Sequence, residues 1–219
     1  MSTLKAVLFD LDGTVLYTLE DICASTNRTL SAFGAPERSM AELRLAVGNG
    51  ARHQVGAYFP GGETGPRFEE AMVYYKADYT RHCADHAVPY DGILEALARL
   101  KAAGLKLAIV TNKPQAPTQV LWQAHFGDLM EFAIGETPGI PRKPAADMVD
   151  LALSRLGLAR EEAVYVGDSE VDIATAKNAG LPCFSVSWGY RSPAELKAAG
   201  AQRLYDRPEA LAQGILELL

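Results

Sequence analysis

Four short polar segments contain the residue types from which a reactive site can be built. In the first, Asp10 and Asp12 stand two residues apart directly after an apolar run, and Gly13 follows them. At the end of an extended strand, side chains two residues apart can point to the same side, and Gly13 lets the backbone turn sharply. Carboxylates held together repel one another unless a cation binds them, and Mg²⁺ suits such a small set of oxygen ligands. The alternative is an Asx-type turn that caps a helix.

A second acidic pair follows another apolar run, which ends at Gly167. Asp168 and Asp172 are four residues apart, a spacing that places side chains on one face of a helix. Both carboxylates could therefore face a metal ion. Alternatively, Asp168 caps the helix together with Ser169, and Asp172 only favours the positive end of the helix. The expected position of this pair opposite Asp10 and Asp12 favours the metal site.

The remaining two segments supply a hydroxyl group, backbone amides and a positive charge. Thr111 and Asn112 end a third apolar run, and Pro114 stands where a helix would begin, so this loop could bind an oxyanion. N-capping by Asn112 is the alternative. Lys143 is the nearest fixed cation that could offset the carboxylates and a phosphoryl group, although a solvated surface lysine is the alternative. Lys113 is a weaker candidate for the same task.

The apolar runs that precede these segments have the character of buried strands, and helical patterns lie between them. The expected strands are 6–9, 105–110, 163–166 and 183–186, and the expected helices are 93–103, 114–125, 147–156 and 172–179. This alternation predicts an α/β fold with a Rossmann-like parallel sheet. Because ligands of an open parallel sheet bind beyond the carboxyl ends of its strands, the four segments should meet at one edge.

One long stretch interrupts the alternation of strands and helices. Amphipathic patterns follow one another there without a convincing strand, at residues 22–33, 40–47 and 68–81. We therefore expect a helical cap domain, residues 17–87, inserted into an α/β core domain made of residues 1–16 and 88–219. The turn-rich residues 88–92 would suit a hinge between the two.

The composition excludes several classes of protein. A net charge of −6 gives no basic stripe for nucleic acid, and an anionic substrate must be attracted by local cations because the overall field repels it. The N-terminal apolar run is too short for a signal peptide, and no apolar stretch is long enough to predict a membrane span. The 3 cysteines are far apart and indicate neither a zinc site nor a disulfide framework, so a cytoplasmic location is expected.

Taken together, the segments DLDGT, TN, K and GDSEVD resemble the motifs of the haloacid dehalogenase superfamily of phosphohydrolases, with a helical insertion after the first motif. The resemblance covers nearly the whole chain. Residues 47–51, 89–92 and 110–114 resemble the phosphoglycolate phosphatase branch in particular, which carries a helical cap at this point.

This resemblance implies a Mg²⁺-dependent phosphatase for a small phosphate monoester, with 2-phosphoglycolate as the leading candidate. Asp10 would be the nucleophile that becomes an aspartyl phosphate. Asp12 would protonate the leaving alkoxide and then activate water. Thr111 and the amide of Asn112 would hold phosphoryl oxygens, while Lys143 would orient the nucleophile.

The resemblance also implies how the metal is held. Mg²⁺ would be bound by the Asp10 carboxylate, by the backbone carbonyl of Asp12 and by Asp168. Asp172 would be a further ligand or would contact one of these ligands. Asp12 itself argues against a dehalogenase, because cleavage of a carbon–halogen bond leaves no alkoxide to protonate.

In the cap, the loop of Gly48, Asn49 and Gly50 could approach a small substrate through its backbone, with Arg52 or His53 as contacts for a carboxylate. A simple turn between two cap helices is the alternative. Members of the family commonly carry Asp-Ser at the position of Tyr17-Thr18, which leaves the substrate and the hinge behaviour open.

Two other functions remain possible at this point. One is a sugar phosphomutase of the same superfamily, similar to β-phosphoglucomutase, which returns the phosphoryl group to a sugar hydroxyl. The other is a regulatory or interaction protein without enzymatic activity. The expected partner is a small phosphorylated metabolite, with neither nucleic acid nor membrane, and the expected assembly is a monomer or a homodimer.

Overall fold

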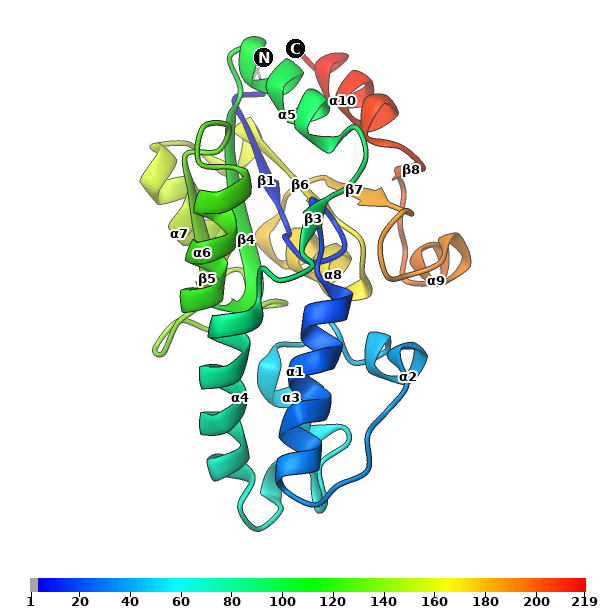
Figure 1. Cartoon of the computed structure of the whole chain (residues 1–219). Helices are drawn as coiled ribbons and strands as arrows, with labels where there is room; N and C mark the ends of the chain where they lie inside the picture. Colours follow the sequence, from blue (N-terminus) through cyan, green and yellow to red (C-terminus); the bar gives the residue numbers. More distant parts are fainter. Residues whose placement is uncertain (1–3) are drawn as a thin grey trace.

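The computed structural model describes residues 4–219 and contains a parallel sheet with a helical unit at one end (Figure 1). The main sheet has 6 strands in the order β5-β4-β1-β6-β7-β8, and all its pairings are parallel. These strands are β1 (Ala6–Phe9), β4 (Lys106–Pro114), β5 (Phe132–Glu136), β6 (Ala163–Gly167), β7 (Cys183–Val186) and β8 (Leu204–Tyr205). The predicted Rossmann-like α/β fold is confirmed.

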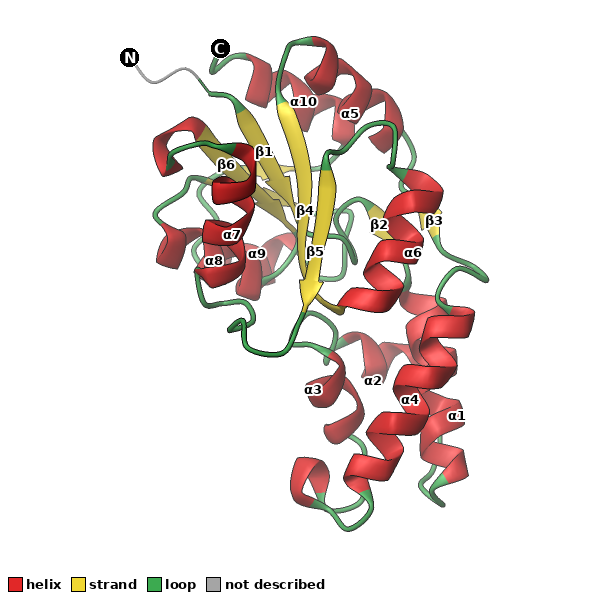
Figure 2. Cartoon of the chain, turned by 90° about the vertical axis from the view of Figure 1, so that its left-hand side faces the viewer, coloured by secondary structure: helices red, strands yellow, loops and turns green. Residues whose placement is uncertain are grey.

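Helices cover both faces of this sheet (Figure 2). On β1, Val7 and Phe9 belong to one hydrophobic core and Ala6 and Leu8 to another, as the two-residue period of a strand requires. The first core includes residues of α5 (Ile93–Ala102), α6 (Gln115–His125) and α10 (Pro208–Leu216), and the second includes residues of α7 (Asp147–Leu156) and α8 (Glu170–Ala179). Burial on both faces explains why β1 is apolar at every position.

Several elements of the main sheet differ from the sequence-based expectation. Strand β5 was not expected, because Ile134 is the single β-branched residue in its sequence FAIGE, and its pairing with β4 makes it a strand. Strand β4 continues to Pro114, beyond the expected end at Val110, with a shift of register between these residues. The short β8, α9 (Pro193–Ala198) and α10 were not expected either.

The helical unit consists of α1 (Leu19–Ala32), α2 (Met40–Arg44), α3 (Ala51–Gly56) and α4 (Phe68–His82). Helices α1 and α4 pack side by side below the sheet in Figure 1. The chain enters this unit through β2 (Leu16–Tyr17) and leaves it through β3 (Val88–Pro89), and these two strands pair antiparallel. Among residues 4–219, no helix has both the length and the apolar character needed to cross a bilayer.

Candidate active site

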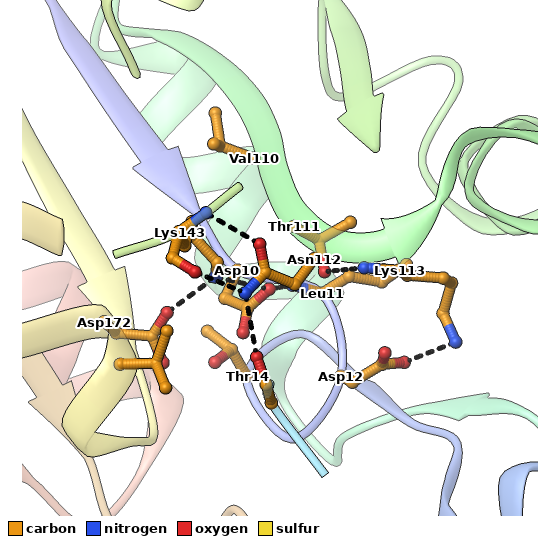
Figure 3. A network of polar contacts seen from close by, with 12 residues as sticks. Asp10, Leu11, Asp12, Thr14, Val110, Thr111, Asn112, Lys113, Lys143 and Asp172 are labelled. Carbon is orange, nitrogen blue, oxygen red and sulfur yellow. Dashed lines mark hydrogen bonds and ion pairs between the residues drawn. The ribbon is translucent and has the colours of Figure 1, made fainter. Parts of the chain in front are cut away.

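Side chains from four separate segments meet at the carboxyl ends of β1, β4 and β6 (Figure 3). Asp10 follows β1 directly, Thr111 lies within β4, and Asp168 follows β6. Lys143 reaches the same place from the loop before α7, with its Nζ atom 3.0 Å from Oδ1 of Asp10 and 2.7 Å from Oδ1 of Asp172. The structure therefore brings together the residues that the sequence placed at one edge of the sheet.

Asp10, Asp168 and Asp172 form a buried cluster in which one carboxylate oxygen of each residue lies within 4.8 Å of the others. Asp168 is fixed by a hydrogen bond of 3.0 Å from the Thr14 hydroxyl and one of 2.7 Å from the amide of Tyr190. The turn at Gly13 passes so close that a Cβ atom there would overlap the Asp168 carboxylate, and Gly13 also has a φ of 80°.

The electrostatics of this cluster favour an additional positive charge. Burial raises the pKa of Asp10 to about 7, with Asp172 and Asp12 adding to the rise and Lys143 opposing it. Burial also raises the pKa of Asp168 well above its ordinary value, and Asp172 and Asp10 raise it further. A set of hard oxygen donors with this excess of negative charge fits Mg²⁺.

Lys143 stays charged in spite of its burial. Burial alone would lower its pKa, but Asp10 and Asp172 together raise it well above the ordinary value. The Tyr165 hydroxyl accepts a further hydrogen bond of 2.9 Å from Nζ. The backbone of Lys143 is held by Asn112, whose Oδ1 accepts from its N–H at 2.8 Å and whose Nδ2 donates to its carbonyl at 2.9 Å.

Asn112 also connects the sheet to the helical unit. Its Nδ2 donates a second hydrogen bond, of 3.0 Å, to the carbonyl oxygen of Gly48. The side chain does not cap α6, because the residue at the N-cap is Pro114 and no side-chain capping bond forms there. The structure therefore gives the Asn112 side chain a positioning role that the sequence did not indicate.

Asp172 lies at the positive end of α8, as one interpretation of the sequence predicted, and also belongs to the carboxylate cluster that could face a metal ion. Its Oδ2 accepts hydrogen bonds from the Ser169 hydroxyl at 2.6 Å and the Ser169 amide at 3.1 Å. The Ser169 side-chain oxygen accepts one of 3.4 Å from the Asp172 amide, so Ser169 rather than Asp168 is the N-cap. Oδ1 of Asp172 pairs with Lys143. Helix α8 begins at Glu170, two residues before the expected Asp172, because this capping box sets the start of the helix at Ser169.

Asp12 points away from the carboxylate cluster, toward the helical unit (Figure 3). Its Oδ1 lies 2.9 Å from Nζ of Lys113 and accepts a hydrogen bond of 2.6 Å from the Thr18 hydroxyl. Nζ of Lys113 also donates to the Tyr79 hydroxyl and lies 4.5 Å from the centre of that ring. Lys113 is therefore more central to the site than the sequence indicated.

A small cavity, of about 40 Å³, lies between the sheet edge and the helical unit. Its walls from the sheet side are Asp10, Asp12, Thr111, Asn112, Lys113 and Pro114. Its walls from the helical unit include Gly48, Gly50, Gln54, Tyr75 and Tyr79. The last three were missed from the sequence, where the apolar pattern of 68–81 indicated only core packing for the two tyrosines.

Three residues expected near the substrate do not line this cavity. Asn49 is adjacent to it but is not part of its wall, and His53 is exposed. The Arg52 guanidinium pairs with Glu69 at 2.8 Å and Glu63 at 3.6 Å. These carboxylates hold it at the surface of the helical unit, so the structure does not bring Arg52 to the cavity.

Comparison with known proteins places this geometry in context. A family model described as haloacid dehalogenase-like hydrolase matches residues 7–186. The chain is 34% identical over 210 residues to the N-acetylmuramic acid 6-phosphate phosphatase of Pseudomonas aeruginosa, covering 95% of this chain and 93% of that protein. It is 38% identical over 189 residues to the phosphoglycolate phosphatase of Xanthomonas campestris pv. campestris, covering 85% of each. The crystal structure of a predicted phosphatase from Clostridium acetobutylicum has a TM-score of 0.89 and 28% identity, covering 99% of this chain and 100% of that one.

Proposed function

The chain belongs to the haloacid dehalogenase-like hydrolase family, and we propose that it is a Mg²⁺-dependent phosphatase that hydrolyses a small phosphate monoester through an aspartyl phosphate. The observation that carries this proposal is the buried cluster of Asp10, Asp168 and Asp172 around Lys143, with Asp10 also lining a cavity. Two relatives that are named phosphatases, and whose similarity extends along most of this chain, support the proposal.

In the first step, a carboxylate oxygen of Asp10 attacks phosphorus and the bond from phosphorus to the ester oxygen breaks. Asp12 donates a proton to the leaving alkoxide, which departs as an alcohol. In the second step, Asp12 takes a proton from water, the water oxygen attacks phosphorus, and the bond from phosphorus to Asp10 breaks. Inorganic phosphate leaves and Asp10 is restored.

The charges around Asp10 explain how the chain supports these steps. Lys143 compensates negative charge beside the nucleophile, and a hydrogen bond from Thr111 lowers the pKa of Asp10 against the effect of burial. Mg²⁺, held by Asp10, Asp168 and the Asp12 carbonyl with Asp172 beside them, would supply electrophilic stabilisation of the phosphoryl oxygens. Most of the rate enhancement then comes from positioning and electrostatics.

We further propose that residues 17–87 act as a cap that opens to admit the substrate. The hinge would be the β2–β3 pair, where the two connecting segments lie together. The present arrangement is closed, because Asn112 bonds to Gly48 and Lys113 bonds to Tyr79 across the cavity. Closure would exclude bulk water from the first step.

Two phosphate monoesters are candidates for the substrate. The resemblance to the phosphoglycolate phosphatase branch makes 2-phosphoglycolate the leading candidate, and the Xanthomonas relative supports it. N-acetylmuramic acid 6-phosphate is the second, because the Pseudomonas relative named for it is similar over 95% of this chain.

The test is phosphate release from p-nitrophenyl phosphate and from both candidate esters by the purified protein. We expect release with Mg²⁺, none after chelation, and none from Asp10→Asn. Activity that persists in both conditions would contradict the proposal. A requirement for a sugar bisphosphate activator would instead indicate the phosphomutase, and the absence of Mg²⁺ binding would favour a protein without enzymatic activity.

A further inference from the structure

Gln54 carries a buried oxygen atom that has no hydrogen-bond partner. The residue lies on α3, is 3% exposed and lines the cavity that also contains Asp10 and Thr111. Among residues 4–219, its Oε1 is one of 2 buried side-chain polar atoms without a partner, and the other, Nε of Arg38, lies outside the cavity wall. A buried oxygen without a hydrogen-bond partner destabilises the fold, so we expect a hydrogen-bond donor to bind it.

The neighbouring backbone determines which end of the carboxamide is free. Nε2 of Gln54 donates a hydrogen bond of 3.4 Å to the carbonyl oxygen of Leu43. A rotation of the amide by half a turn would place Oε1 against this carbonyl, which is itself only an acceptor. The contact with Leu43 therefore keeps the oxygen as the unpartnered group, and the missing partner must be a donor.

The positively charged residue on the wall of the same cavity, Lys113, does not offer a free site for a carboxylate. Lys113 is the single cation among the described residues that line it, and its Nζ already contacts Asp12 and the Tyr79 hydroxyl. A substrate carboxylate at this place would compete with Asp12 for Lys113. The residues that line the cavity thus include one unpartnered acceptor, Oε1 of Gln54, and no cation without a partner.

We propose that Gln54 is a specificity-determining residue whose Oε1 accepts a hydrogen bond from a hydroxyl or N–H group on the organic part of the substrate. The inference rests on the proposed phosphatase function and defines its substrate class as phosphate monoesters of sugars, amino sugars or similar polyols. At neutral pH 2-phosphoglycolate carries an ionised carboxylate and a phosphate that is largely ionised, and its organic part has no donor. N-acetylmuramic acid 6-phosphate also carries a carboxylate, but its sugar ring supplies hydroxyl and N–H donors. These donors favour it over 2-phosphoglycolate.

The experiment compares kcat/KM values for esters that differ in donors. The panel contains 2-phosphoglycolate, N-acetylmuramic acid 6-phosphate, and the pair ribose 5-phosphate and 2-deoxyribose 5-phosphate, with p-nitrophenyl phosphate as a generic substrate. The variants Gln54→Leu and Gln54→Met both remove the acceptor Oε1. They replace glutamine by a branched and by a linear apolar side chain, respectively. Gln123→Leu, at an exposed position of α6, is the matched control.

We expect the wild-type protein to prefer the best hydroxyl- or N–H-bearing ester over 2-phosphoglycolate. Both Gln54 variants should lower the ratio of these two kcat/KM values by roughly 10- to 100-fold, the range for loss of one buried hydrogen bond, and Gln123→Leu should leave the ratio unchanged. Thermal melting should show Gln54→Leu at least as stable as the wild type, because the unpartnered oxygen is gone.

A wild-type preference for 2-phosphoglycolate, or a ratio that both Gln54 variants leave unchanged, would overturn the inference. The wild-type comparison decides this even if a variant does not fold. Failure of the wild type to hydrolyse any ester, p-nitrophenyl phosphate included, would instead overturn the proposed phosphatase function. Hydrolysis of the generic ester without a preference for donors would refute the role of Gln54 alone.

Discussion

The Nζ atom of Lys143 lies 2.7 Å from Oδ1 of Asp172, and both side chains are completely or almost completely buried. Oδ2 of the same aspartate accepts the capping hydrogen bonds of Ser169 at the start of α8. Asp172 thus ties the lysine to the end of a helix, and the lysine in turn lies 3.0 Å from Asp10. The position of the positive charge beside Asp10 depends on this connection.

Replacement of Lys143 by Met should reduce kcat by about 100- to 1,000-fold, the range for loss of one stabilising group at a developing charge. It should also lower the free energy of unfolding by about 3 kcal/mol in the absence of Mg²⁺, because buried carboxylates lose their cation. Steady-state kinetics and urea unfolding measure the two effects. Lys177→Met, at an exposed position of α8, is the control, and an equal effect there would contradict the assignment.

Replacement of Asp168 by Asn should weaken Mg²⁺ binding. Mutation of residues that only support a metal ligand costs roughly 10- to 100-fold in affinity, so we expect at least this rise in the Mg²⁺ concentration for half-maximal activity. Thermal melting provides an independent measurement, because Mg²⁺ at 100 times its Kd should stabilise the wild type by about 2.7 kcal/mol. A variant that Mg²⁺ stabilises as much as it does the wild type would argue against Asp168 as a ligand.

Gly13→Ala should abolish activity, because a Cβ atom at this position overlaps the Asp168 carboxylate. Gly34→Ala is a matched control, since Gly34 has a φ of 74° and its Cβ would meet nothing within 4 Å. Both variants carry the backbone strain of about 1–2 kcal/mol for a non-glycine residue in this region, but only Gly13→Ala displaces the carboxylate. Comparable activity in the two variants would show that the overlap is relieved without consequence.

His86 should stabilise the protein more at low pH than at high pH. Its Nδ1 lies 2.8 Å from Oδ1 of the buried Asp21, and this hydrogen bond, followed by the charges of Asp21, Glu20 and Asp85, raises the pKa of the imidazole. The stabilisation is therefore fully present below the unfolded pKa of about 6.5 and is lost as pH rises through the folded value. The difference in unfolding free energy between wild type and His86→Gln should be larger at about pH 5.5 than at about pH 9.

The pKa of His125 is shifted in the opposite direction to that of His86, so the two histidines can be compared. Burial lowers the pKa of this imidazole, so its contribution to stability is lost as pH falls. The difference between wild type and His125→Gln should therefore decrease toward low pH. The same pH trend for both variants would mean that the Asp21 contact does not control the titration of His86.

The sequence by itself determined the parallel sheet and the residues at its edge. Apolar runs and the polar groups that follow them are local features, and in a parallel sheet the ends of the strands must lie together. This reasoning placed Asp10, Lys143 and Asp168 at one edge, where the structure has them. It did not identify β5, because the short sequence FAIGE becomes a strand only through pairing with β4.

Only the tertiary structure decided the direction in which each side chain points and which partner it meets. Lys113 contacts Asp12, while Arg52 is held away from the cavity by Glu63 and Glu69. The unpartnered oxygen of Gln54 likewise depends on the Leu43 carbonyl, which belongs to no motif of the sequence and accepts a hydrogen bond from Nε2 of Gln54. Sequence spacing indicates most elements of the sheet, but the pairing of charges and the partners of buried polar atoms depend on packing between separate elements.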